Sequence, residues 1–350
     1  MHIAFRVEGN SQIGLGHLMR CLALAQHGVQ KGYQISFLMT SLSYEQALNR
    51  SDWVGEVSLL ENAQNELDEL ERFCLRNKVD VLILDGYQFT CAYRCELAKI
   101  LKAQSVLFVA IDDNNDLGRL YADCIINPNS HASSLNYHQT ESYAHCCLGD
   151  SFRILRGEFH LTPKQQSEAI RLDNRSALTI ILGGADTTNL SYELAAKFSD
   201  ALPRIPINVI TGGAFPHATQ LSKFADETIN VTHWHNAQQV SDIFLVSRLV
   251  ISAGGATQYE LQALYTPAML LIVADNQFQA CMQSHNTGKA VALDTRNGME
   301  SCDIVKQGLS LWHDEMKLKA IMNANATQAN INGADNIFSA VIKLKSSLGK

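Results

Sequence analysis

Residues 2–39 read HIAFRVEGNSQIGLGHLMRCLALAQHGVQKGYQISFLM and contain a complete strand–helix–strand pattern. His2–Val7 is a short apolar run typical of a buried strand, and Gln34–Met39 is a second one. Between them, Leu18–Lys31 has the spacing of an amphipathic helix, which Gly32 ends. The apolar positions on one face of that helix are Leu18, Leu22, Ala25 and Val29. The stretch therefore predicts one unit of a parallel α/β sheet.

The same alternation continues along the chain in two series. Further strands are expected at Val79–Leu84, Val106–Ile111, Cys124–Ile126, Ala177–Leu182, Ile207–Ile210, Glu227–Val231, Leu249–Ser252 and Ala268–Val273. Helices are expected at Glu66–Arg76, Cys91–Lys102, Asn189–Ser199 and Ala256–Leu264. Strands rich in Val, Ile and Leu that alternate with helices predict doubly wound parallel sheets. We expect two Rossmann-like domains, 1–160 and 176–350, joined by a polar linker at 161–175 and facing a cleft.

Composition narrows the class of protein. The chain has 350 residues, is 46% hydrophobic and 18% charged, and carries 28 Lys and Arg against 35 Asp and Glu, a net charge of −7. It is too apolar to be disordered, and its acidic balance argues against broad nucleic-acid binding. The nine cysteines are an odd number without zinc spacing, which indicates reduced thiols. With no signal peptide or membrane-length apolar run in the sequence, we expect a soluble cytoplasmic protein.

A glycine-rich loop follows the first strand and runs from Glu8 to His17, directly into the helix. Its glycines allow close backbone approach, and amides at a helix start can bind anions. A dinucleotide-binding fingerprint would need a third glycine at Met19, so a nicotinamide cofactor is not supported. His17 can act as a general base because its ordinary pKa lies near neutral pH. The alternative is that His17 only caps or packs the helix.

Two further glycine turns follow strands of the second series. Gly183-Gly184 is one, and Gly254-Gly255-Ala256-Thr257 is the other. Backbone amides and the Thr257 hydroxyl could hold a phosphate, and Glu260, one turn later, could bind the hydroxyls of a ribose. The alternative for each glycine pair is an ordinary tight turn.

Acidic and histidine pairs also occur after strands. Asp85, and the pair Asp112-Asp113, could bind Mg²⁺ or act as acid and base, but such residues are as often caps and turn formers. His233 and His235 have the spacing of a metal pair, yet alternate strand residues more often just pack, and we expect no metal site.

The chain resembles a known family of nucleotide-sugar enzymes. The residues that carry the resemblance are Phe5–Glu8, Ile13–Ala25, Asp85–Tyr87, Ile111–Asp113, Leu148–Phe159, Leu182–Asn189, Ser252–Glu260, Pro267 and Ala274–Gln277. They are similar to the UDP-2,4-diacetamido-2,4,6-trideoxy-β-L-altropyranose hydrolases of pseudaminic acid biosynthesis. The resemblance covers nearly the whole chain, and the run from Phe5 to Ala25 is its most specific part.

The resemblance implies a GT-B fold, related to the bacterial N-acetylglucosaminyltransferase that completes lipid II. It implies cleavage of the anomeric C–O bond by water, with inversion and without metal or cofactor, giving UDP and the free sugar. His17 would be the general base, and Tyr87 and Asn276 would lie on the sugar side. The implied substrate contacts are Gly14, Gly16, Arg156, Gly183, Gly184, Val240, Gly254, Gly255, Ala256, Thr257, Glu260 and Gln277. A monomer serving surface polysaccharide or flagellin glycosylation is expected.

The chain departs from the family pattern at four positions, which are Glu8 for Asp, Gly86 for His, Gly157 for Pro and Arg248 for Asp. The change at Gly86 bears on which sugar is bound rather than on UDP. Two other functions remain open from the residues. One is a GT-B glycosyltransferase that moves an amino sugar from a UDP donor to an acceptor, and the other is a nucleotide-sugar binding protein without activity.

Overall fold

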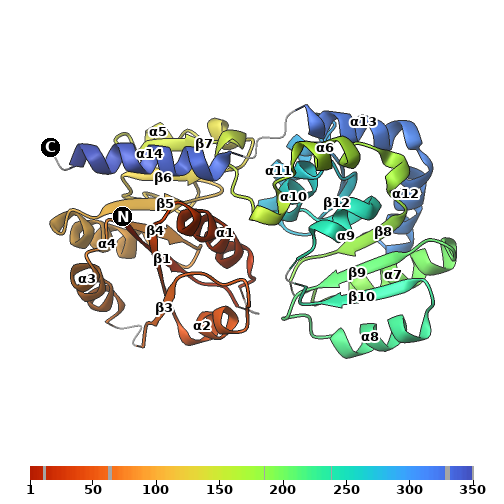
Figure 1. Ribbon diagram of the computed structural model, residues 1–350, viewed down its shortest axis with the longest axis horizontal. Helices are drawn as coiled ribbons and strands as arrows, with labels where there is room; N and C mark the ends of the chain where they lie inside the picture. The colour runs from red at the N-terminus through yellow and green to blue at the C-terminus, as the bar shows by residue number, and fades with distance from the viewer. Residues whose placement is uncertain (11–12, 62–64, 185, 238, 328–331, 349–350) are drawn as a thin grey trace. The chain divides into compact units, whose positions relative to one another are not determined.

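The computed structural model describes residues 1–10, 13–61, 65–184, 186–237, 239–327 and 332–348 (Figure 1). The chain forms two compact units. Unit 1 comprises Met1–Gly157 together with Asn330–Lys350, and unit 2 comprises Glu158–Ala329.

The described part of unit 1 contains a seven-stranded parallel sheet in the order β3-β2-β1-β4-β5-β6-β7. The strands are β1 (His2–Val7), β2 (Gln34–Met39), β3 (Glu56–Leu59), β4 (Val81–Asp85), β5 (Leu107–Ile111), β6 (Cys124–Asn127) and β7 (His145–Leu148). The α-helices are α1 (Gly16–Gln30), α2 (Ser41–Leu48), α3 (Glu66–Asn77), α4 (Cys91–Ala103), α5 (Tyr137–Thr140) and α14 (Gly333–Leu348).

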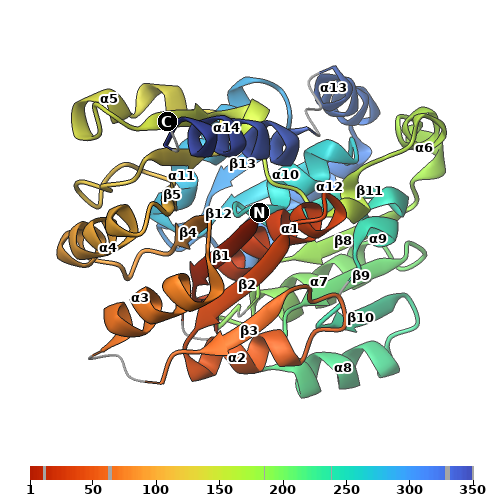
Figure 2. The ribbon, with the colours of Figure 1, turned by 60° about the vertical axis from the view of Figure 1, so that its left-hand side comes forward.

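Strand β1 is buried on both faces and explains the two-sided core of unit 1. Phe5 stacks on Phe37 of β2, with ring centroids 4.9 Å apart, in the cluster that also contains side chains of α1 and α14. Ala4, which points to the opposite face, packs in the cluster that contains side chains of α3 and α4. Figure 2 shows α1 and α14 side by side on their face of the sheet.

The described part of unit 2 contains a six-stranded parallel sheet in the order β10-β9-β8-β11-β12-β13. The strands are β8 (Ala177–Ile181), β9 (Ile207–Thr211), β10 (Val231–His235), β11 (Ser247–Ala253), β12 (Ala268–Ile272) and β13 (Val291–Asp294). The α-helices are α6 (Pro163–Ala169), α7 (Leu190–Ala201), α8 (Ala218–Glu227), α9 (Ser241–Val246), α10 (Thr257–Ala263), α11 (Phe278–Asn286), α12 (Ser301–His313) and α13 (Glu315–Ala326).

Each sheet has a point where the strand order reverses. In unit 1 it lies between β1 and β4, and in unit 2 between β8 and β11. Open α/β sheets bind ligands outside the carboxyl ends of the strands at this point. The loops that flank it are those after β1 and β4 in unit 1 and those after β8 and β11 in unit 2. They carry most of the residues that the sequence predicts to be functional.

The predicted doubly wound sheets are confirmed, and the errors fall on their edges. The sequence does not predict strands β3, β7 and β13, and the strand expected at Glu227–Val231 is wrong because α8 continues to Glu227 and β10 begins at Val231. These four strands lie at the ends of the two sheets. An edge strand needs fewer apolar residues than a central one, so its sequence is a weaker signal.

The C-terminal helix α14 belongs to unit 1, whereas the sequence predicts one domain over 176–350. Its buried residues Ile337, Phe338 and Val341 join the core cluster of α1. The His27 ring stacks on Phe338 at 6.2 Å, and its Nε2 is 3.1 Å from Asp335. An amphipathic helix near a chain end does not reveal from its sequence which sheet it covers.

The predicted linker, 161–175, is instead folded into unit 2 as α6 and a 3₁₀ turn at Leu172–Asn174. Arg175 explains why. Its guanidinium is buried and donates hydrogen bonds to acceptors of α6, α9, the start of β11 and the turn after α10. The acceptors are the carbonyl oxygens of Ala169, Phe244, Ser247 and Leu264 and the hydroxyl of Thr266, at 2.7–3.2 Å. Burial lowers the pKa of Arg175 to about 10.

Replacing Arg175 should therefore destabilise unit 2. Arg175→Ala leaves several buried carbonyls without a donor and should lower the free energy of unfolding by about 3–5 kcal/mol, with Arg175→Lys intermediate. Urea unfolding followed by tryptophan fluorescence measures the loss, since Trp234 and Trp312 lie in unit 2. Arg171→Ala, at an exposed position of the same segment, is the control. Equal stability of the Arg175→Ala and Arg171→Ala proteins would contradict the role given to Arg175.

Candidate functional site

His17 and Asp85 form a hydrogen-bonded pair at the reversal point of the unit 1 sheet. His17 lies in the first turn of α1, and Asp85 is the last residue of β4. The Nδ1 atom of His17 is 2.8 Å from Oδ1 of Asp85, whose side chain is fully buried. A carboxylate that accepts the Nδ1 proton fixes the tautomer in which Nε2 carries the lone pair. His17 is thus arranged as a base, as in an acid–histidine dyad.

Arg20 lies one turn after His17 and contacts the same carboxylate. Its Nε donates to Oδ2 of Asp85 at 2.5 Å and its Nη2 to Oδ1 at 2.6 Å. Nη2 is also 3.0 Å from Nδ1 of His17. Arg20 can only donate, so it could bond to Nδ1 only if the ring proton were on Nε2. The Asp85 carboxylate is the stronger acceptor for both groups, and this favours the proton on Nδ1.

Arg20 also bridges to a second carboxylate, Asp113, which follows β5. Its Nη1 is 2.7 Å from Oδ1 of Asp113. Burial opposes the charge of Arg20, but Asp113 and Asp85 outweigh it and hold its pKa well above the ordinary value. Burial likewise raises the pKa of each carboxyl, but the Arg20 charge dominates and leaves the pKa values of Asp85 and Asp113 below their ordinary range. All three groups are therefore charged at neutral pH.

Tyr87 completes this cluster from the loop after β4. Its hydroxyl donates to Oδ2 of Asp113 at 2.7 Å, and its ring lies edge-on to the His17 ring with centroids 4.5 Å apart. Asn129, after β6, donates to Oδ1 of Asp113 at 3.1 Å. The site thus joins side chains from the carboxyl ends of four neighbouring strands, β1, β4, β5 and β6. We name His17, Arg20, Asp85, Tyr87, Asp113 and Asn129 the dyad cluster.

Gly86 shapes the loop that carries Tyr87. Its φ is +145°, a backbone conformation that L side chains rarely adopt. A histidine, which the resembled family has at this position, would be strained here.

The paired acids Asp112 and Asp113 have different surroundings. Asp112 accepts hydrogen bonds from the Tyr137 hydroxyl and from the Asn115 amide, the latter at 2.7 Å. Burial raises the pKa of Asp112. Asp112 is thus a turn former inside unit 1, whereas Asp113 belongs to the dyad cluster. These hydrogen-bond partners of the Asp112 carboxylate differ from those of the Asp113 carboxylate.

The glycine loop before α1 is anchored by Glu8. The Glu8 carboxylate is buried and accepts bonds from Arg6, from the amide and hydroxyl of Thr40, and from Ser43. It therefore ties the loop after β1 to the start of α2. Gly14 pairs with Asn10 in an isolated bridge, and Gly16 begins α1 at an exposed position. The predicted loop also includes Ser11 and Gln12, which lie outside the described residues.

In unit 2, the Gly254–Thr257 turn follows β11 at the reversal point. A Cβ on Gly254 would overlap the Cys281 sulfur, so this glycine is required for packing against α11. A Cβ on Gly255 would meet nothing within 4 Å. Buried Gln258 donates to the carbonyl oxygens of Gly254 and Gly255 at 3.1 and 3.3 Å, and its Oε1 accepts from Ser284 at 2.8 Å. Gln258, which the sequence did not single out, holds the turn.

The other predicted turn, Gly183-Gly184, precedes a helix whose first amides are already hydrogen-bonded. It follows β8, and Ala185 lies outside the described residues. The Asp186 carboxylate accepts from the amides of Leu190 and Ser191 at 3.2 and 2.7 Å, at the start of α7. These amides therefore already hold a negative charge. The residue that precedes α10 is Ala256, whose methyl group cannot make such a bond, so the Gly254–Thr257 turn is the better candidate for a phosphate.

The remaining predicted contacts have diverse surroundings. Glu260 is half-buried one turn into α10. The Val240 amide donates to Glu158 at 2.8 Å, so this amide is already engaged. Asn276 is exposed in the 3₁₀ turn Asp275–Gln277, and Gln277 accepts through Oε1 from the Val273 amide at 3.1 Å. Arg156 is half-buried at the end of the first segment of unit 1.

His233 and His235 are occupied within unit 2. The Thr211 hydroxyl lies 2.8 Å from Nε2 of His233 and 3.2 Å from Nδ1 of His235, and Ser222 lies 2.8 Å from Nδ1 of His233. Across the described residues, His, Cys, Asp and Glu do not gather in groups of three that could hold a metal ion.

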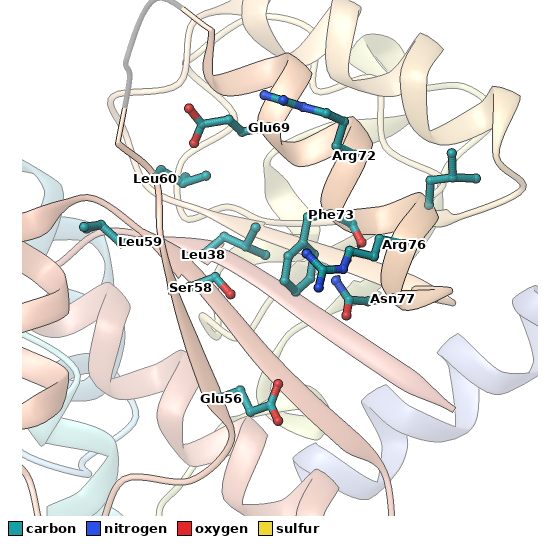
Figure 3. Close-up of a pocket in the computed structure, with 11 residues that line it drawn as sticks. Leu38, Glu56, Ser58, Leu59, Leu60, Glu69, Arg72, Phe73, Arg76 and Asn77 are labelled. Carbon is teal, nitrogen blue, oxygen red and sulfur yellow. Dashed lines mark hydrogen bonds between the residues drawn. The ribbon is translucent and has the colours of Figure 1, made fainter.

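A cavity of about 720 Å³ lies between α3 and strands β2 and β3 (Figure 3). Leu38, Phe73, Arg72 and Arg76 are among its lining residues, and Figure 3 shows their side chains around it. None of the site residues that the sequence analysis named lines this cavity. It is thus separate from the dyad cluster.

Comparison with known proteins links the chain to nucleotide-sugar enzymes. It is 26% identical over 259 residues to the UDP-2,4-diacetamido-2,4,6-trideoxy-beta-L-altropyranose hydrolase of Campylobacter jejuni, covering 72% of this chain and 85% of that protein. It is 23% identical over 301 residues to the spore coat polysaccharide biosynthesis protein SpsG of Bacillus subtilis, covering 84% of each. A match to protein MJ1062 of Methanocaldococcus jannaschii is 22% identical and spans 80% of this chain but only 57% of that protein. No protein-family model matches.

Solved structures agree on the architecture. MurG of Acinetobacter baumannii superposes with a TM-score of 0.65 at 15% identity, covering 98% of this chain and 99% of that one. The S. aureus MnaA–UDP structure gives 0.67 at 11% identity, covering 99% and 98%. The fold is GT-B. Among the described residues, none of the helices combines the length and apolar composition needed to span a bilayer.

The depressed pKa values of Asp85 and Asp113 predict acid sensitivity. With folded-state pKa values below the ordinary 3.8, both groups stabilise the fold fully above about pH 5, and this contribution is lost as pH falls toward the folded-state values. Asp113→Asn should lower the free energy of unfolding by about 2 kcal/mol at pH 7. The difference from wild type should shrink toward pH 3.

Urea unfolding at pH 7, 5, 4 and 3 measures this difference. Asp116→Asn, an exposed carboxylate in the same loop, is the control and should show little change. A difference between wild type and Asp113→Asn that stays constant over this pH range would contradict the assignment.

Proposed function

We propose that this chain is a metal-independent hydrolase of UDP-activated amino sugars. Its substrate would be a UDP-2,4-diacetamido-2,4,6-trideoxyhexose, with the β-L-altro sugar of pseudaminic acid biosynthesis as the first choice. The observation that carries the proposal is the His17–Asp85 pair at the reversal point of a GT-B sheet. The similarity to the Campylobacter hydrolase over 72% of the chain supports the substrate class.

In this mechanism His17 takes a proton from water through Nε2. The water oxygen attacks the anomeric carbon from the face opposite UDP, and the C–O bond to UDP breaks with its electrons going to the phosphate oxygen. The sugar is released with inverted configuration. Asp85 stabilises the imidazolium that forms, and Arg20 keeps Asp85 ionised. General base catalysis of this kind contributes about 10²–10⁴-fold to the rate.

UDP would bind to unit 2 through the Gly254–Thr257 turn, with Glu260 on the ribose. Amides of the turn and the Thr257 hydroxyl would meet the charge of the diphosphate, so that UDP leaves without a strong general acid. Arg156, Val240 and Gln277 complete the proposed UDP contacts, while Asn276 and Tyr87 would face the sugar. The backbones of Gly14 and Gly16 in unit 1, and those of Gly183 and Gly184 in unit 2, are further proposed substrate contacts. We further propose a cytoplasmic monomer that serves surface polysaccharide or flagellin glycosylation.

A glycosyltransferase is the second candidate, because the fold is shared with a protein titled Glycosyltransferase from Rickettsia africae. The two functions differ in their need for an acceptor. Incubation with a panel of UDP-diacetamido-trideoxyhexoses, without acceptor, should release UDP, and NMR should find the inverted anomer first. UDP release that requires an added acceptor would favour transfer. Tight UDP binding without turnover of any donor would indicate a binding protein.

His17 should be essential for turnover but not for UDP binding. His17→Ala and His17→Asn remove the base and should lower kcat at least ~100-fold, with the Kd for UDP nearly unchanged. Steady-state UDP release and calorimetric titration with UDP measure the two quantities. His138→Asn, at an exposed position of unit 1, is the control and should behave as wild type. Near-normal turnover in folded His17→Ala protein would refute the mechanism.

Gly254 and Gly255 should respond differently to substitution. Gly255→Val places a side chain in open space at the proposed phosphate position, so it should weaken UDP binding at least ~10-fold without a change in Tm. Gly254→Ala should instead lower the Tm, because its Cβ would overlap Cys281. Thermal unfolding and UDP titration of both proteins separate the two effects. Unchanged UDP affinity in Gly255→Val would exclude this turn as the phosphate site.

A further inference from the structure

We propose that Asp113 makes Tyr87 a hydrogen-bond acceptor for an N–H or O–H group of the sugar. Tyr87 thereby selects UDP-sugars that carry such a group at this position. The inference rests on the proposed function, because it assigns a sugar contact in that site. Asp113 acts here as a positioning residue, through Tyr87.

The Asp113 carboxylate accepts hydrogen bonds from three neighbouring side chains. Its Oδ1 accepts from Nη1 of Arg20 at 2.7 Å and from Nδ2 of Asn129 at 3.1 Å, and its Oδ2 accepts from the Tyr87 hydroxyl at 2.7 Å. An ionised carboxylate can only accept hydrogen bonds. Arg20 keeps the pKa of Asp113 well below its ordinary value despite burial. The bond between Tyr87 and Asp113 therefore has one direction, with the phenol proton toward Asp113.

This direction determines what Tyr87 can offer a ligand. A tyrosine hydroxyl has a single proton and two lone pairs. With its proton held by Asp113, the Tyr87 oxygen can accept from a ligand but cannot donate to it. An acetamido N–H or a sugar hydroxyl fits this requirement, whereas a phosphate or carbonyl oxygen would meet a lone pair. Tyr87 consequently cannot donate a proton to the leaving group, and in the proposed site it acts as an acceptor for the sugar.

The orientation of Tyr87 is fixed as well as its polarity. Its ring packs edge-on against His17 at 4.5 Å, and 41% of the residue is exposed. The same residue thus touches the proposed base and reaches solvent beside it. A sugar group bound by the Tyr87 oxygen would lie next to the base, which helps to orient the anomeric carbon for attack.

Asp113→Asn reverses the polarity with little change in shape. Its side-chain oxygen can still accept from Arg20 and Asn129, while its amide now faces Tyr87 and donates to the phenol oxygen. The Tyr87 proton then turns away from residue 113 toward the ligand. Tyr87→Phe removes the acceptor altogether. If Asp113 acts through Tyr87, the two substitutions should not be additive.

The experiment measures donor binding by calorimetry in a His17→Asn background, where turnover is stopped. The four proteins are this background alone and with Asp113→Asn, Tyr87→Phe or both, and the ligands are a UDP-diacetamido-trideoxyhexose and UDP. Each single substitution should weaken donor binding about 10-fold, the pair should be no weaker than either one, and UDP binding should not change. Asp116→Asn is the control for loss of a nearby charge.

Two results would overturn the inference. One is unchanged donor affinity in Asp113→Asn, and the other is an Asp113→Asn effect that persists in full when Tyr87 is Phe, since Asp113 would then act through Arg20. Wild-type turnover is assayed separately and tests the proposed function. If the effects of Asp113→Asn and Tyr87→Phe on donor binding are not additive but the wild type does not hydrolyse the donor, the hydrolase function is rejected and the Tyr87 contact stands. If the wild type hydrolyses the donor but the two effects are additive, the hydrolase function stands and the Tyr87 inference is rejected.

Discussion

The guanidinium of Arg20 lies between the carboxylates of Asp85 and Asp113, and the geometry of the dyad cluster depends on it. The Asp85 carboxylate is buried and that of Asp113 is largely shielded, so the two negative charges at the ends of adjacent strands would repel each other without a cation between them. Arg20 comes from α1 and bonds to Asp85 at the end of β4 and to Asp113 after β5. It therefore ties the helix after the first strand to two neighbouring strand ends, and it keeps ionised the carboxylate that orients His17.

The two glycine turns of unit 2 differ in the groups that already hydrogen-bond to them and to the helices that follow. Both follow strands at the reversal point, and their sequences offer similar amides. The Asp186 carboxylate accepts a hydrogen bond from the Ser191 amide at the start of α7. The Gln258 side-chain amide donates to the carbonyl oxygens of Gly254 and Gly255 and leaves the amides of that turn out of its own bonds. The start of α7, which follows the first turn, is thus bonded by the protein's own carboxylate, whereas the second turn is held in shape by a neutral amide. This difference is what makes the second turn suited to a diphosphate.

The sequence predicted the central strands, because buried strands leave strong local patterns, and it singled out His17 and the glycine turns from their places after strands, while Tyr87 came from the family resemblance. It did not predict the edge strands, whose residues are half polar, or the partner of α14, which is decided by contacts such as that between His27 and Asp335, 308 positions apart. It named Asp85 and Asp113 as acids but not as partners of Arg20. That pairing joins residues 65 and 93 positions apart. The one sequence signal for the pairing of Arg20 with these acids was its spacing of three residues from His17, which places both side chains on one face of the helix.

Hydrolysis in H₂¹⁸O tests the central claim most directly, because the position of the isotope shows whether water attacks the anomeric carbon or the phosphorus atom. If His17 directs water to the anomeric carbon, mass spectrometry should find all of the released UDP unlabelled, with the isotope entering the free sugar. Isotope in the β-phosphate of UDP would mean that water attacks phosphorus. That result would contradict the mechanism built on the His17–Asp85 pair.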